Sequence, residues 1–114
     1  GIGAFPSVQQ PRVIWAGLQE ADALMRLQRS IESKMKELGY DTEERPFSAH
    51  VTIGRVKQHV THQQIVNCGI VVARQDIGGL DGFIVESVEL YRSELTRGAP
   101  IYTRLHTYRL KPRF

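Results

Sequence analysis

A stretch with a helical pattern of apolar and charged residues at positions 20–38 limits the possible folds of this chain more than any other feature. Lys, Arg and Glu lie between apolar side chains that recur every three or four residues. These apolar residues are Leu24, Leu27, Ile31, Met35 and Leu38. This spacing puts the apolar side chains on one face of an α-helix. Gly39 follows as a residue suited to the position after a helix C-terminus. We therefore predict an amphipathic helix over residues 20–38.

Apolar, β-rich runs surround this helix and predict strands at residues 12–18, 47–57, 83–91 and 101–110. Thr61, with Gln64 three residues later, matches a capping box and opens a second helix that extends to about residue 73. Three glycines within residues 76–82 predict a loop. The order β-α-β-α-β-β predicts an α+β fold with a largely antiparallel sheet and helices packed on one face.

The composition limits the class of protein. The chain has 114 residues, enough for one domain, and its 41% hydrophobic and 24% charged residues argue against wholesale disorder. No apolar run approaches the roughly 20 residues of a membrane helix, so we expect no membrane partner. The single cysteine, Cys68, cannot form an internal disulfide, which favours the cytoplasm. A net charge of +3 permits a phosphate-bearing partner without requiring one.

His50 and Thr52 are the strongest candidates for chemistry. Residues two apart on a strand share a face, so these two side chains project together while Val51 and Ile53 point into the core. A histidine transfers protons near neutral pH, and a threonine hydroxyl donates a hydrogen bond to a phosphate oxygen. Arg55 adds positive charge, although perfect alternation puts it on the opposite face unless the strand bulges or twists.

The same His-x-Thr string occurs again nine residues later, at His59 and Thr61. There, Thr61 has a simpler role as the N-cap of the second helix. The spacing also leaves no room for a helix between two such strands. We therefore expect the second string to be structural.

Other kinds of site find little support. The chain has four histidines: His50, His59, His62 and His106. Their spacing matches no recognised zinc site, so we predict no metal and no cofactor. Cys68 has no identifiable base near it in sequence. The chain also has no glycine loop of the kinds that bind nucleotide phosphates.

Aromatic and basic residues bracket the last predicted hairpin: Tyr91, Ser93, Tyr102 and Arg104. Such side chains stack on a base or hold a phosphate, and we take Tyr102 as a candidate substrate-binding residue. Packing within the hairpin and a solvated edge is the alternative for each of them.

Four segments together resemble one family, the two-histidine phosphoesterases. The closest branch is the RNA 2′,3′-cyclic phosphodiesterases, also called 2′-5′ RNA ligases. The segments are GIGAFPS at residues 1–7, PRVIWAG at 11–17, RPF leading to HVTIGR at 45–55, and LYRSEL with GAPIY at 90–102. Their order and spacing cover nearly the whole chain and are far more specific than His-x-Thr alone.

The resemblance implies that residues 1–114 are the C-terminal part of a single domain, one lobe of a bilobal fold with pseudo-two-fold symmetry. In the family, two His-x-Thr motifs face each other across a cleft. By resemblance, His50 belongs to the second motif and accepts a proton, Thr52 contacts the phosphate, and Arg55 matches a basic position. The first motif lies upstream in the family, and this chain begins at Gly1 without a Met. We therefore expect it to be a fragment or a processed product.

The resemblance further implies a metal-independent, cytoplasmic enzyme that opens RNA 2′,3′-cyclic phosphate ends to 2′-phosphates, with related 2′-5′ ligation. Such opening needs one group to activate water and another to protonate the leaving oxygen. One imidazole on one strand does not easily serve both sides of an in-line displacement. We expect a monomer for the full-length parent.

An alternative of a different class stays open. The chain would then be a catalytically incomplete RNA-binding or structural half-domain, or would pair with a second copy so that two His50 residues complete one cleft. The position of a second strand-borne histidine relative to His50 distinguishes these hypotheses.

Overall fold

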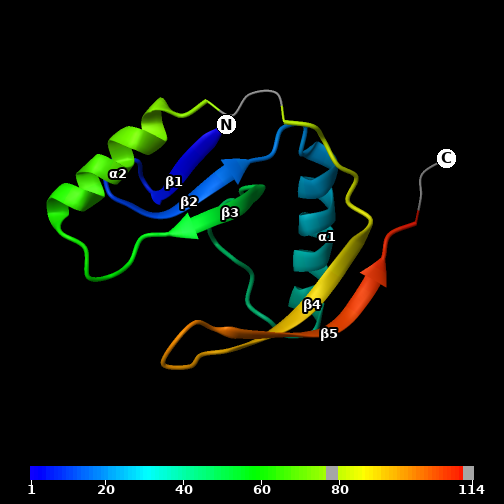
Figure 1. Cartoon of the computed structure of the whole chain (residues 1–114). Helices are drawn as coiled ribbons and strands as arrows, with labels where there is room; N and C mark the ends of the chain where they lie inside the picture. The colour runs from blue at the N-terminus through cyan, green and yellow to red at the C-terminus, as the bar shows by residue number, and fades with distance from the viewer. Residues whose placement is uncertain (77–79, 112–114) are drawn as a thin grey trace. The chain divides into compact units, whose positions relative to one another are not determined.

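The computed structural model describes residues 1–76 and 80–111. Figure 1 shows its elements in chain order: β1 (Ile2–Pro6), β2 (Pro11–Gly17), α1 (Asp22–Glu37), β3 (His50–Arg55), α2 (His62–Arg74), β4 (Ser87–Glu94) and β5 (Ile101–Arg109). The strands pair antiparallel throughout, so the predicted α+β class is confirmed. The chain divides into two compact units, residues 1–79 and residues 80–114.

The first unit is built on a three-stranded sheet with the order β1-β2-β3. Strand β2 confirms the strand predicted at residues 12–18. Most of residues 1–6 form the strand β1, in which Ile2 lies opposite Ala16. Backbone hydrogen bonds from Leu18 to Ala49 (3.1 Å) and from Val56 to Arg12 (2.8 Å) close the two ends of the β2–β3 ladder.

Helix α2 packs against β1 and β2 of this sheet (Figure 1). Its buried residues are Ile65, Gly69 and Val72. Gly69 permits a close approach, because a Cβ at this position would overlap the backbone carbonyl oxygen of Val8. A side chain at position 69 would therefore force the helix away from the segment that joins β1 to β2.

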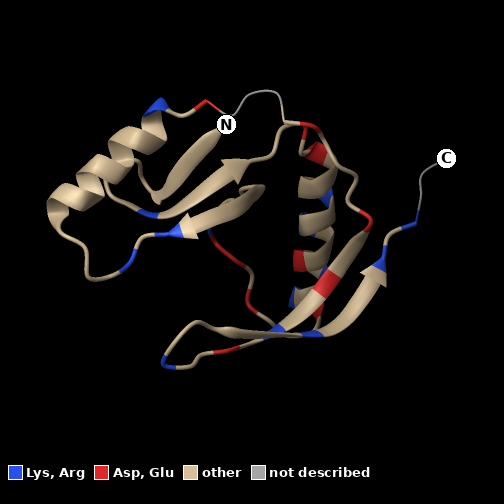
Figure 2. Cartoon of the chain, viewed as in Figure 1, with Lys and Arg blue, Asp and Glu red and all other residues tan. Residues whose placement is uncertain are grey.

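Helix α1 confirms the predicted amphipathic helix. Gly39 follows it with a φ of +98°, the left-handed conformation that suits a glycine after a helix end. Both acidic and basic residues are distributed along α1 (Figure 2). None of its residues is buried, and Ile31 and Met35 of its apolar stripe are exposed. The expected packing of a helix on the sheet is therefore seen for α2 and not for this stripe.

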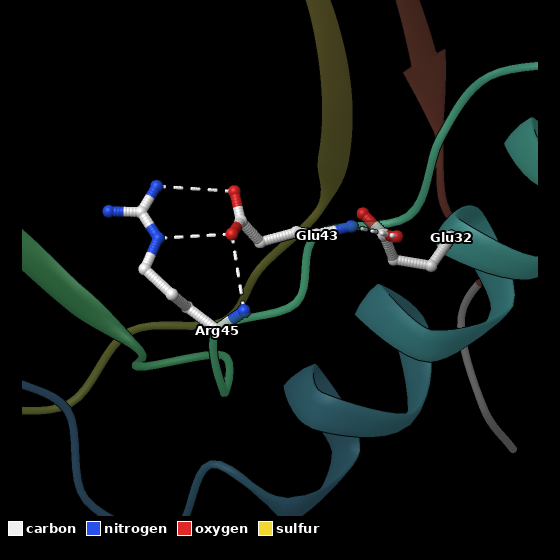
Figure 3. Close-up of polar contacts among 3 residues, drawn as sticks. All are labelled: Glu32, Glu43 and Arg45. Atoms are coloured by element: carbon white, nitrogen blue, oxygen red, sulfur yellow. Dashed lines mark hydrogen bonds and ion pairs between the residues drawn. The ribbon is translucent and has the colours of Figure 1, made fainter.

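The connection from α1 to β3 is held by three residues (Figure 3). Arg45 donates from Nε and Nη2 to the two carboxylate oxygens of Glu43, at 3.0 and 3.2 Å. The backbone N–H of Glu43 donates to a carboxylate oxygen of Glu32 on α1, at 3.2 Å. The hydrogen-bonded guanidinium lowers the pKa of Glu43 to about 2, so this carboxylate is charged at neutral pH. These bonds tie the segment that enters β3 to the helix.

The second unit is a two-stranded antiparallel hairpin, β4–β5. The strand predicted at residues 101–110 is confirmed. The strand predicted at residues 83–91 is wrong at its start, because residues 83–86 are not in a strand and β4 runs on to Glu94. Apolar side chains at 83–85 are exposed rather than packed, which explains why an apolar run alone misplaced the strand. Part of the loop predicted at residues 76–82 lies outside the described residues.

Within the described residues, neither helix has the length and apolar composition needed to cross a membrane.

Candidate functional site

His50 and Thr52 lie on the same face of the β1–β3 sheet. His50 pairs with Gly17 of β2 and Thr52 pairs with Trp15, and paired residues in an antiparallel sheet share a face. Both side chains are exposed. The strand geometry expected from their spacing is therefore present, and the two polar groups are accessible to a ligand.

The imidazole of His50 is oriented by the backbone two residues before it. Nδ1 lies 2.6 Å from the carbonyl oxygen of Ser48. A carbonyl oxygen only accepts, so Nδ1 carries the hydrogen and donates it. In a neutral imidazole the other nitrogen, Nε2, is then the unprotonated one. This arrangement leaves Nε2 free to accept a proton.

Two aromatic rings support the imidazole from β1 and β2. The ring centroid of Phe5 lies 5.1 Å from that of His50 in an edge arrangement, and the Trp15 centroid lies 6.4 Å away. Phe5 and Trp15 also contact each other, at 5.3 Å. A Cβ on Gly3 would overlap the indole of Trp15, so this glycine makes room for the ring. The imidazole therefore packs against two aromatic rings, which we call the aromatic support.

Sequence reasoning missed this support. The available signal was the alternation of Gly3 and Phe5, of which Gly3 lies opposite Trp15 and Phe5 opposite Val13. It carried no weight because the pairing of residues 1–6 with β2 is not visible in a local pattern.

A β-bulge decides the position of Arg55. Trp15 pairs with Thr52, but the next residue back on β2, Ile14, pairs with Gly54, so Ile53 is an extra residue on β3. One extra residue reverses the alternation beyond it. Arg55, opposite Val13, thus lies on the face of Thr52 and His50. This is the bulge that the sequence analysis required for Arg55 to reach the site.

The expectation that Val51 and Ile53 point into the core is wrong. Val51 is 51% exposed and Ile53 is 57% exposed. Helix α2 packs on β1 and β2, so the face of β3 that carries Val51 is left uncovered. Ile53 is the bulge residue and has no partner position in the ladder.

The second His-x-Thr string is structural, as predicted. Thr61 is the N-cap of α2, and its Oγ1 accepts from the backbone N–H of Gln64 at 3.1 Å. The Gln64 side chain accepts in turn from the Thr61 N–H at 2.8 Å. His59 precedes the helix in a turn, and His62 opens the first helical turn. Within the described part of the first unit, His50 is thus the only histidine on a strand.

The hairpin holds a polar cluster of its own on one face. Glu89 accepts hydrogen bonds from three side chains: Tyr91 (2.9 Å), Arg104 (3.3 Å) and Thr107 (3.3 Å). The hydrogen bond from Tyr91 is the largest cause that lowers the pKa of Glu89, and the same bond raises the pKa of Tyr91. Arg104 and Tyr91 therefore bond to an internal carboxylate, which agrees with the alternative of packing within the hairpin.

Tyr102 differs from this cluster. It pairs with Ser93 and is 62% exposed, and among the described residues it makes no hydrogen bond or ion pair. His106 is also on β5, opposite Leu90. No group of three or more His, Cys, Asp or Glu residues in the described ranges is arranged to hold a metal ion.

Comparison with known proteins identifies the family of this chain. The model of the family described as LigT-like phosphoesterase matches residues 17–102. A protein of Archaeoglobus fulgidus named RNA 2′,3′-cyclic phosphodiesterase is 34% identical over 108 residues, covering 95% of this chain and 58% of that protein. Proteins of the same name resemble the chain in Methanothermobacter thermautotrophicus (33% over 110 residues, 96% and 58%) and Thermotoga maritima (31% over 106 residues, 93% and 53%). The chain thus spans only between half and three-fifths of the length of these relatives.

Proposed function

Since this chain belongs to the LigT-like phosphoesterase family, we propose that it is the C-terminal part of a cytoplasmic RNA 2′,3′-cyclic phosphodiesterase. The observation that carries this proposal is the free Nε2 of His50 on the same sheet face as Thr52 and Arg55. A proton acceptor, a hydroxyl donor and a guanidinium on one face are the groups that hydrolysis of a phosphate ester needs.

In the proposed reaction His50 acts as the base. Its Nε2 takes a proton from water as the water oxygen attacks the phosphorus of the cyclic phosphate. The bond from phosphorus to the ribose 3′ oxygen breaks in line, and a second acid protonates that oxygen, which leaves a 2′-phosphate and a 3′-hydroxyl. By family resemblance, the second acid is the histidine of the other His-x-Thr motif.

Thr52 and Arg55 act on the phosphate. The Thr52 hydroxyl donates to a non-bridging oxygen, and the Arg55 guanidinium opposes the charge that this oxygen carries in the transition state. Tyr102 is exposed and offers an aromatic face, so we assign it to stacking on a base of the RNA. Among the described residues no acidic side chain bonds to Arg55, which leaves its charge available.

A second candidate function rests on the isolation of His50 within its unit. The described part of the first unit has one histidine on a strand. This fits an RNA-binding half-domain that has no hydrolytic activity by itself. Two copies that join their His50 faces would be the other route to a complete site. The 114-residue chain assayed alone, across a range of concentrations, separates these cases, because activity through pairing rises with the square of a low chain concentration.

The central test uses the two His-x-Thr strings as a matched pair. In the full-length enzyme, His50→Ala should lower kcat for an RNA that ends in a 2′,3′-cyclic phosphate by about 10²- to 10⁴-fold, the usual contribution of a general base. His59→Ala removes the same side chain from the capping string and should retain wild-type activity.

Equal activity of wild type and His50→Ala would contradict the proposal. A metal chelator is expected to leave the rate unchanged, and complete inhibition that added metal reverses would contradict the metal-free assignment.

A further inference from the structure

The sheet and α2 carry no negative charge. All 12 Asp and Glu residues fall in residues 20–45 and 76–114, and none falls in residues 1–19 or 46–75. The charged residues of these two acid-free segments are all basic: Arg12, Arg55, Lys57 and Arg74. Figure 2 shows blue but no red on β1, β2, β3 and α2. This part of the molecule therefore attracts anions, independently of the small net charge of the whole chain.

Three of these cations lie at or next to one end of the sheet, where there is a hollow. The hollow is lined by the start of β2 and the end of β3: Arg12, Val13, Arg55, Val56 and Gln58. Val13 pairs with Arg55, and the Val56 N–H donates to the Arg12 carbonyl at 2.8 Å, so the backbone of the hollow is fixed. Lys57 lies between two of the lining residues in the chain.

The arginines of the hollow lack internal partners. Arg12 and Arg55 are both exposed, and within the described residues neither forms an ion pair or a side-chain hydrogen bond. Each guanidinium group can therefore donate to an anion without first giving up an internal partner.

The hollow begins where the His50–Thr52 face ends. Arg55 is three residues beyond Thr52, which on a strand is about 10 Å and somewhat less across a bulge. Arg55 can reach back toward Thr52 along its flexible side chain, but Arg12 and Gln58 lie beyond it. One phosphate group cannot occupy both the His50–Thr52 face and the hollow, whereas a nucleotide chain can.

We infer that this hollow binds the phosphodiester that precedes the reacting 2′,3′-cyclic phosphate, with Arg12 and Gln58 donating to its oxygens. The inference rests on the proposed function and specifies its substrate class: an RNA chain with at least one upstream phosphodiester, in preference to a mononucleotide. Val13 and Val56 give the hollow an apolar part that suits the adjoining ribose.

Two substrates separate the hollow from the catalytic face. In the full-length enzyme, we compare a nucleoside 2′,3′-cyclic phosphate, which has one phosphate, with a short RNA that has the same terminal nucleotide. Arg12→Ala should raise the ratio of KM for the RNA to KM for the mononucleotide by roughly threefold to tenfold. This is the effect expected of an exposed charge-assisted contact. The slope of log KM against log salt for the RNA should fall by about 0.7, the loss of one phosphate contact on a single strand.

The matched control is Arg74→Ala. Arg74 belongs to the same acid-free part and loses the same charge, but it ends α2 and does not line the hollow. It should leave the ratio of the two KM values at the wild-type level. An equal change in this ratio for Arg74→Ala, or an unchanged ratio for Arg12→Ala, would overturn the inference. Arg12→Lys keeps the charge and should restore part of the ratio.

A binding measurement keeps the two proposals distinguishable. Fluorescence anisotropy of a labelled RNA with an unreactive 3′-hydroxyl end reports the hollow without any turnover. If the wild-type enzyme binds this RNA and Arg12→Ala weakens binding more than Arg74→Ala, the hollow holds RNA even if hydrolysis is absent. If the wild type hydrolyses the cyclic end but the two variants bind this RNA equally well, the assignment of the hollow as a phosphodiester site is wrong and the proposed function stands.

Discussion

The β1–β3 sheet and the β4–β5 hairpin use the same local device with different results. Each contains a strand with one extra residue, Ile53 in β3 and Leu105 in β5. Both extra residues are apolar and exposed, at 57% and 53%. In each case the bulge reverses the alternation and places an arginine on the polar face: Arg55 in the sheet and Arg104 in the hairpin.

The two arginines then differ in their partners. Arg104 donates to Glu89 at 3.3 Å, so its charge is compensated within the hairpin. Arg55 lies in a part of the chain without a single acidic residue. The comparison teaches that a bulge brings a cation to a face, but the neighbouring carboxylates decide whether that cation is available to an anion.

The sharpest way to break this comparison is to remove each arginine in turn. Arg55→Ala should lower kcat/KM for a cyclic-phosphate RNA by roughly 10- to 100-fold, the value of a hydrogen bond to a charged group. Arg104→Ala should cost less than threefold, because this guanidinium bonds to Glu89. Steady-state kinetics of both variants in the full-length enzyme measure the difference, and equal losses would show that internal pairing does not distinguish the two.

A tyrosine pair tests the proposed role of the Tyr102 face of the hairpin in RNA binding. Tyr102 and Tyr108 are equally exposed, at 62% and 61%, and six residues apart. The bulge at Leu105 puts them on opposite faces, because Tyr102 pairs with Ser93 whereas Tyr108 pairs with Val88. Tyr102→Ala should raise KM for RNA at least about fivefold, the low end of base stacking on an aromatic ring.

Tyr108→Ala is the control for this substitution and should leave KM near the wild-type value. A larger effect at Tyr108 than at Tyr102 would reverse the assignment of the faces.

The first unit also depends on a close contact that the hairpin lacks. Gly69→Ala would place a methyl group against the Val8 carbonyl and should lower the free energy of unfolding by about 1–3 kcal/mol, as overpacking does. Gly98→Ala makes the same change in the hairpin, where a Cβ meets no atom, and should change the stability by less than about 0.5 kcal/mol. Thermal or denaturant unfolding measures both, and the reverse order would contradict the packing of α2.

The smallest expected effect concerns acid pH and the hairpin cluster. Its hydrogen bonds lower the pKa of Glu89 below 4.5 in the folded state, so their stabilisation is present above pH 4.5 and is lost as the pH falls through the lowered value. Tyr91→Phe removes the largest of these bonds and should raise the pKa of Glu89 toward 4.5. A carboxyl titration followed by NMR measures this shift, and an unchanged pKa would remove Tyr91 as its cause.

Local patterns were sufficient for much of the fold. The spacing of Leu24, Leu27 and Ile31 predicted α1, and the pairing of Thr61 with Gln64 predicted the cap of α2. These elements depend on neighbours three or four residues away, so a short window of sequence contains their causes. The same window identified the capping His-x-Thr string and left the other one as the candidate site.

The candidate site was predictable only in part. The shared face of His50 and Thr52 follows from strand alternation alone. The Phe5 and Trp15 support depends on how β1 pairs with β2, and these two residues are ten positions apart in the chain. The burial of Val51 was misjudged because it depends on which strands α2 covers, and no local pattern reports that.

The sequence by itself therefore determined which residues are available: a histidine two positions from a threonine on a strand, an arginine nearby, and no acidic residue from position 46 to position 75. The tertiary structure decided where they point. The register of β3 against β2 made Ile53 an extra residue and brought Arg55 to the face of His50. Register depends on hydrogen bonds between distant strands, and one residue of shift moves every later side chain to the other face.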